Sequence, residues 1–284
     1  MNSRLAVLPL VFVLVAMVSI QFGASLAKSL FAALGAEGAT ALRLALGALM
    51  LLALYRPWRG ASLAGGRRDL LIYGASLGLM NLFFYLALAR APMGIVVAIE
   101  FLGPLGVAIA ASRRWLDFLW VLLAVLGLSL LLPLHADAPA LDPVGVLFAL
   151  LAAVGWALYI VYGTRIGLAH GGRSVALGMV IAALVVLPVG VANSGSALLD
   201  PSHLPLALAV AVLSSALPYS LEMYALTRIA TRSFGILMSL EPALAAVAGL
   251  LVLGEYLSTL QWLAIASVML ASFGSTMTTA PTTK

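Results

Sequence analysis

Long apolar runs, separated by short connectors that carry most of the charge, dominate the chain. A helix needs about 20 apolar residues to cross the roughly 30 Å hydrocarbon layer of a bilayer. Ten runs of about that length occur, at residues 5–27, 39–55, 70–89, 93–111, 116–134, 144–163, 174–191, 204–226, 233–253 and 257–275. The pattern predicts an all-α integral membrane protein with ten transmembrane helices.

The composition supports a lipid environment. Of 284 residues, 64% are hydrophobic and only 9% are charged, whereas soluble domains are about 25% charged. A net charge of +5 suits nucleic-acid binding in a soluble protein, but here Lys and Arg gather in alternate connectors, as membrane topology requires. The lipid bilayer is therefore the expected partner, and no nucleic acid is expected.

The distribution of Lys and Arg predicts the orientation. With the amino terminus inside, only Lys28 and Arg90 fall in outer connectors, and Arg43 lies within a span. The inner group comprises Arg4, Arg56, Arg59, Arg67, Arg68, Arg113, Arg114, Arg165, Arg173, Arg228, Arg232 and Lys284. Because cytoplasmic connectors are enriched in Lys and Arg, both termini should be cytoplasmic. The first run is longer than a typical signal-peptide core, so we expect it to remain as a helix.

A short motif occurs twice and indicates an internal repeat. A glycine stands six residues before Glu100 in the fourth run and six before Glu241 in the ninth, and a proline follows each glutamate closely. We therefore predict two five-helix repeats, residues 1–135 and 136–284. Because five is odd, the second is inverted relative to the first, an arrangement typical of transporters whose halves rock around a midplane site.

The repeated glutamates are the first candidates for a site. Glu100 lies about 12 Å into its span, and Glu241 lies at a similar depth. An ionised carboxylate there costs several kcal/mol unless it is paired, hydrated or protonated, so both should face the bundle interior or an aqueous cavity. Pro104 and Pro242 should break their helices. The alternative is that the glutamates only cap broken helices or pair across the repeat interface.

Polar residues at helical spacing add further candidates. Gln21, Ser25 and Lys28 share one face of the first span, and Arg43 of the second span is a candidate clamp for a substrate carboxylate. Lys28 has a more ordinary interpretation, in which its side chain extends to the outer interface. For Arg43 the alternative is an ion pair with Glu37 or Glu222.

The third, sixth and eighth spans contribute weaker candidates. Ser215, Tyr219 and Glu222 share one face of the eighth span. Further aromatic and amide candidates are Asn81, Tyr85 and Trp156. Such aromatic residues also serve as packing or interfacial residues.

Six segments resemble the drug/metabolite transporter superfamily with paired EamA-type domains. They are SIQFGASLAKSLF, GATALRLALGAL, YGASLGLMNLFFYLAL, IEFLGPLGVAI, LSSALPYSLEMYALTR and SLEPALAAVAGL. This resemblance implies a ten-helix exporter in a bacterial inner membrane. It also implies small neutral amino acids of the threonine and homoserine type as substrates, with the proton as the expected coupling ion. A broader exporter of metabolites or drugs is the alternative.

The sequence argues against an enzyme. Cysteine is absent and the three histidines are scattered, so neither a cofactor nor a metal site is expected. An intramembrane enzyme, such as a protease or a lipid transferase, is disfavoured because no H-E-x-x-H motif occurs and no Ser/His pair lies within the predicted spans. A passive channel is disfavoured because inverted halves with kinked helices suit alternating access. The oligomeric state does not follow from the sequence.

Overall fold

A computed structural model describes residues 3–59, 66–110, 115–130, 141–226, 228, 234 and 237–278. Within these ranges the regular structure is helical throughout, without strands. The helices before residue 135 are α1 (Ser3–Lys28), α2 (Phe31–Tyr55), η1 (Pro57–Arg59), α3 (Arg67–Leu88), α4 (Met93–Glu100), α5 (Leu102–Ala110) and α6 (Leu116–Ser129). The later helices are α7 (Pro143–His170), α8 (Gly172–Ser194), η2 (Gly195–Leu199), η3 (Pro201–His203), α9 (Leu204–Ala211), η4 (Val212–Ala216), α10 (Leu217–Leu226), α12 (Glu241–Ala248), η5 (Gly249–Leu253) and α13 (Thr259–Thr278).

Seven helical stretches are long and apolar enough to cross a membrane. They are Leu8–Lys28, Phe31–Arg59, Arg67–Leu88, Pro143–Gly167, Gly172–Leu199, Pro201–Glu222 and Thr259–Met277. Three shorter apolar helices, Met93–Val107, Phe118–Ser129 and Glu241–Leu253, coincide with the predicted fourth, fifth and ninth spans. Several ends of those spans, including residues 131–134 and Gly235, lie outside the described residues. The chain is therefore an all-α membrane protein with at least seven candidate spans.

Large apolar side chains cover much of the outer surface. Leu49, Phe118, Leu184 and Leu251 are each more than 60% exposed. A soluble bundle would turn such residues inward, whereas lipid tails solvate them at no cost. The outside of the bundle is therefore suited to hydrocarbon.

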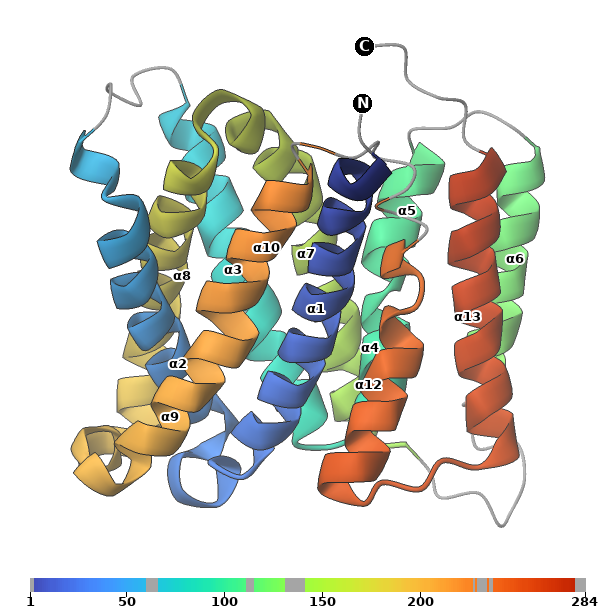
Figure 1. The fold of residues 1–284 in the computed structure, drawn as a ribbon. Helices are drawn as coiled ribbons and strands as arrows, with labels where there is room; N and C mark the ends of the chain where they lie inside the picture. Colours follow the sequence, from blue (N-terminus) through green and yellow to red (C-terminus); the bar gives the residue numbers. More distant parts are fainter. Residues whose placement is uncertain are drawn as a thin grey trace.

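Helices that are distant in sequence pack side by side (Figure 1). α2 packs along α8, α3 along α7, and α1 along α10, while α12 contacts α4 and α6 contacts α13. Helix α1 begins and α13 ends at the same end of the bundle, so the carboxyl end of α1 lies at the opposite end. We call that opposite end the far end.

Several helices are interrupted along their length. Glu100 is the last residue of α4, and Glu241 is the first residue of α12, so the helix breaks predicted beside both glutamates are present. The sequence did not predict the π-helices η4 and η5 or the left-handed φ of +64° at Gly35 in α2. Non-helical backbone at membrane depth is tolerated only where protein or water satisfies it, and in transporters it marks binding regions.

Candidate functional site

Eight of the predicted site residues are buried inside the bundle, each at most 7% exposed. They come from six helices and form what we call the central polar cluster: Gln21 and Ser25 of α1, Arg43 of α2, Asn81 and Tyr85 of α3, Glu100 of α4, Tyr219 of α10 and Glu241 of α12. Neither glutamate faces lipid. The prediction that both acids point into the bundle is therefore confirmed, whereas an aqueous cavity around them stays a prediction.

Arg43 is anchored on α3 and only 2% exposed. Its Nη1 donates to the Tyr85 hydroxyl at 2.9 Å, its Nη2 donates to Asn81 Oδ1, and the guanidinium lies 5.0 Å from the centre of the Tyr85 ring. Asn81 is itself held because its Nδ2 donates to the Leu77 carbonyl at 2.7 Å. These contacts fix the plane of the guanidinium, as recognition of a carboxylate requires.

The predicted alternative for Arg43, an ion pair with Glu37 or Glu222, is wrong for this structure. Among the described residues no ion pair includes Arg43. Its Nε is buried without a hydrogen-bond partner there, while the Glu100 carboxylate interacts with the guanidinium electrostatically. Arg43 therefore keeps an unused donor beside an acidic side chain.

The second focus of the cluster is Glu241. Its Oε1 accepts a 3.0 Å hydrogen bond from Gln21 Nε2, whereas its Oε2 is buried and has no partner within the described part of the chain. Glu100 and Glu222 both interact with it electrostatically. Glu222 is half-buried on α10. Three acids from three helices therefore act on one region. The contact with Gln21 joins α1 of the first predicted repeat to α12 of the second, which agrees with the alternative that Glu241 pairs across the repeat interface.

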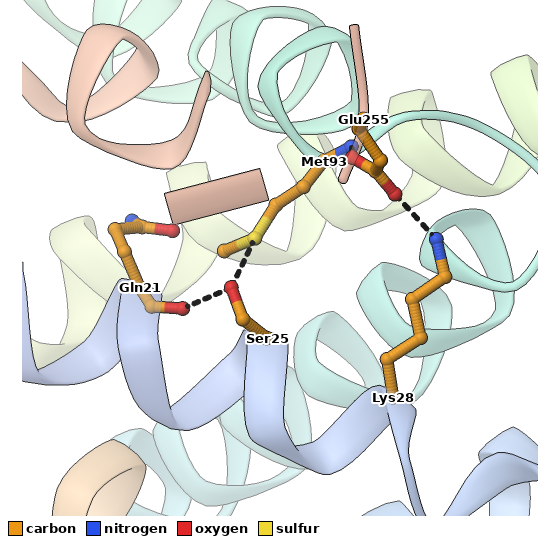
Figure 2. Close-up of polar contacts among 5 residues, drawn as sticks. All are labelled: Gln21, Ser25, Lys28, Met93 and Glu255. Atoms are coloured by element: carbon orange, nitrogen blue, oxygen red, sulfur yellow. Dashed lines mark hydrogen bonds and ion pairs between the residues drawn. The ribbon is translucent and has the colours of Figure 1, made fainter. Parts of the chain in front are cut away.

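A chain of contacts leads from Gln21 to the far end of the bundle, as Figure 2 shows. The Ser25 hydroxyl donates to the Gln21 carbonyl at 2.9 Å and lies 3.1 Å from the Met93 sulfur. The Met93 N–H donates to Glu255 Oε2 at 2.7 Å, and Glu255 Oε1 lies 2.6 Å from Lys28 Nζ. Glu255 thus fastens the end of α1 to the start of α4. We call the contacts of Glu255 with Lys28 and Met93 the far-end latch.

The latch corrects the interpretation of Lys28. Its side chain was expected to extend to the interface, but it is only 29% exposed and pairs with Glu255. Sequence reasoning did not select Glu255 as a site residue. The available signal was that the charge count places Lys28 and Glu255 in connectors on the same side of the membrane.

Aromatic side chains pack beside the cluster. The Trp156 ring meets the Phe101 ring edge-on at 5.4 Å, and Tyr159 lies between Tyr73 and Tyr219, with centroid distances of 5.2 and 6.3 Å. Trp156 is half-buried and has no other ring contact among the described residues. Its observed role is packing next to the α4–α5 break.

Comparisons with known proteins agree with the arrangement. Residues 143–277 match the model of the EamA-like transporter family. The chain is 57% identical to the threonine/homoserine exporter RhtA of Escherichia coli (strain K12), over 95% of this chain and 92% of that one. It is 56% identical, with the same coverage, to the threonine/homoserine exporter RhtA of Salmonella typhimurium (strain LT2). One crystal structure, 21% identical, superposes with a TM-score of 0.65 over 94% of this chain and 96% of the other, a likeness of fold alone.

Proposed function

Because the chain belongs to the EamA-like transporter family, we propose that it exports small neutral amino acids of the threonine and homoserine type across a bacterial inner membrane. The relatives that bear the name threonine/homoserine exporter are similar to this chain over nearly its whole length. An exporter moves its substrate across the membrane without converting it.

The observation that carries the proposal is the central polar cluster. An amino acid is a zwitterion, which needs donors for its carboxylate and an anion for its ammonium. Arg43, held in plane and with a free Nε, supplies the first. Glu241, with a free Oε2, supplies the second. Glu100 interacts with both side chains and therefore links the two poles.

The excess of buried acids supports the proposal that export is coupled to protons. Glu100 and Glu222 both act on Glu241, and of these three acids Glu100 interacts with the buried arginine, Arg43. Two uncompensated carboxylates are expensive at membrane depth, so a proton or the ammonium of the cargo must neutralise them. If the two compete for one acid, entry of a proton expels the amino acid, and the proton gradient drives export.

The helix packing supports two inverted repeats, residues 1–135 and 136–284, that move by alternating access. We count α4 with α5 as one span and α9 with α10 as another, so that each span of the first half corresponds to the span five places later. The contact of α3 with α7 then corresponds to the contact of α10 with α1. The pairs α2 with α8, α4 with α12 and α6 with α13 map onto themselves. This twofold pattern is what ten helices in two inverted halves produce.

Orientation follows from charge and topology. Arg56, Arg67, Arg165 and Arg173 lie at the end of the bundle where α1 begins, whereas Lys28 lies at the far end. The positive-inside rule then places both termini in the cytoplasm and the far end outside. In the conformation described here, the latch fastens that outer end.

The test is efflux from proteoliposomes that hold the purified protein. Labelled threonine or homoserine is loaded inside, and efflux is measured with and without an imposed pH gradient. We expect the gradient to accelerate efflux, and Glu100→Gln and Glu241→Gln to abolish that acceleration at equal protein levels. Full activity in both variants would overturn the site. Equal efflux of unrelated metabolites would favour the broader exporter.

A further inference from the structure

Ser215, in the π-helix η4, carries a buried hydroxyl that makes no use of its hydrogen-bonding capacity. Its side chain is 0% exposed, and its Oγ has no partner in the described part of the structure. Neighbouring serines behave differently: Ser214 Oγ donates to the Val210 carbonyl at 2.6 Å, and Ser220 Oγ donates to the Ala216 carbonyl at 2.6 Å. Both neighbouring serine hydroxyls thus donate to the backbone carbonyl four residues earlier, whereas the Ser215 hydroxyl does not.

The π-helix and the packing of α2 place Ser215 beside the central polar cluster. A π-helix shifts the register of the side chains that follow it, and such segments are frequent at functional sites. Ser215 faces Gly47 of α2, where an added Cβ would come within 2.8 Å of the Ser215 Cβ. Gly47 lies one helical turn after Arg43 on the same face of α2.

The next turn of the eighth span belongs to the same region. Tyr219 stands four residues after Ser215, is only 4% exposed and belongs to the central polar cluster. The Ser215 hydroxyl therefore lies between two elements whose adjacent turns supply cluster residues. Because Gly47 has no side chain, the Ser215 side chain packs directly against α2 at this point.

We infer that Ser215 recognises the side-chain hydroxyl of the exported amino acid, an inference that rests on the proposed function. The zwitterion is satisfied by Arg43 and the acids, so the remaining polar group of threonine or homoserine is its hydroxyl. A serine hydroxyl both donates and accepts, and it pairs with an alcohol in either sense. A site that has a buried partner for a substrate hydroxyl discriminates against the analogue that lacks one, because the partner then stays unpaired.

The test compares export of hydroxylated amino acids with that of their isosteres. Full-length protein in proteoliposomes is loaded with threonine or valine, and separately with homoserine or norvaline. We expect the unsubstituted protein to prefer each hydroxylated member. Ser215→Ala should lower that preference about tenfold, the ratio that corresponds to one hydrogen bond. Ser214→Ala is the matched control, because it removes an adjacent buried hydroxyl that already has a backbone partner, and it should leave the preference unchanged.

The possible results separate the role of Ser215 from the export function. If Ser215→Ala slows threonine and valine equally, or changes neither, Ser215 does not recognise the hydroxyl, and the proposed export function still stands. If the unsubstituted protein exports none of the four amino acids, the proposed function fails first. Loss of preference in Ser215→Ala together with unchanged valine efflux supports the inference, since a folding defect would slow both substrates.

Discussion

Breaking the far-end latch should open the outer side of the protein. Lys28→Met removes the ammonium while keeping an apolar stem. Among the described residues, it leaves the Met93 N–H as the one partner of the Glu255 carboxylate. Glu255→Gln removes the charge but keeps an oxygen that accepts the Met93 N–H, so its effect should be smaller. If the latch holds the outer end closed, both variants shift the conformational equilibrium toward an outward-open state.

The expected size of the effect follows from the burial of the pair. Pairs fully exposed to solvent contribute less than about 1 kcal/mol, whereas loss of one partner of a fully buried pair costs about 3–5 kcal/mol. Lys28 and Glu255 are 29% and 15% exposed, and so lie between these limits. We take about 1–2 kcal/mol for Lys28→Met, a factor of about 5 to 30 in the ratio of closed to open protein.

Thiol labelling measures that ratio. The chain has no cysteine, so Ser25→Cys, which places a thiol at a fully buried position between the latch and Gln21, introduces the sole reactive group. A membrane-impermeant maleimide applied outside should label it about 5- to 30-fold faster when Lys28→Met is added. Exchange of the two charges, Lys28→Glu with Glu255→Lys, should restore only part of the protection, because a lysine cannot accept the Met93 N–H.

A second ion pair provides the control. Arg90 Nη1 lies 3.3 Å from Asp142 Oδ2, also at the far end, but the side chains are 43% and 35% exposed. Arg90→Gln should leave the labelling rate of Ser25→Cys unchanged. Unchanged labelling in both Lys28→Met and Glu255→Gln would refute the reasoning, and an equal increase in Arg90→Gln would show general loosening instead.

Further predictions concern the cluster, the packing around it and the helix start at Asp142. Arg43→Lys should reduce export at least tenfold, because an ammonium cannot keep the hydrogen bonds to Tyr85 and Asn81 while it binds a carboxylate. Tyr85→Phe removes one of these hydrogen bonds and should reduce export less. Gly47→Ala should destabilise the protein by about 1–3 kcal/mol in a thermal-shift assay through its clash with Ser215, and Gly106→Ala, with no atom within 4 Å of the added carbon, should not. The hydrogen bond from the Val144 N–H lowers the pKa of Asp142. The stabilisation of α7 by Asp142 is therefore complete above the ordinary aspartate pKa and is lost as the pH falls through the lowered pKa. Asp142→Asn should remove this acid dependence of the melting temperature.

Much of the architecture is predictable because the bilayer imposes a single length and a single polarity on each span. The apolar runs therefore correspond to helices, and Arg43, Glu100 and Glu241 point inward because charge in lipid is costly. The helical spacing of polar residues and their depth in the membrane, however, do not predict which helices are in contact. The bond of Glu241 with Gln21 and the latch of Glu255 with Lys28 join residues more than 200 positions apart. Periodicity along single helices does not specify such pairs.

Glu100 and Glu241 occupy equivalent positions in the proposed repeat, but the residues around them differ. Glu100 ends one helix and interacts with Arg43, whereas Glu241 begins another and accepts a hydrogen bond from Gln21. If the carboxylate of the cargo binds Arg43 as proposed, its ammonium would face Glu241, whereas the reverse orientation would place like charges together. The proposed site would therefore accept the cargo in one orientation. In that orientation the side chain of the cargo is proposed to contact the eighth span, where Ser215 lies.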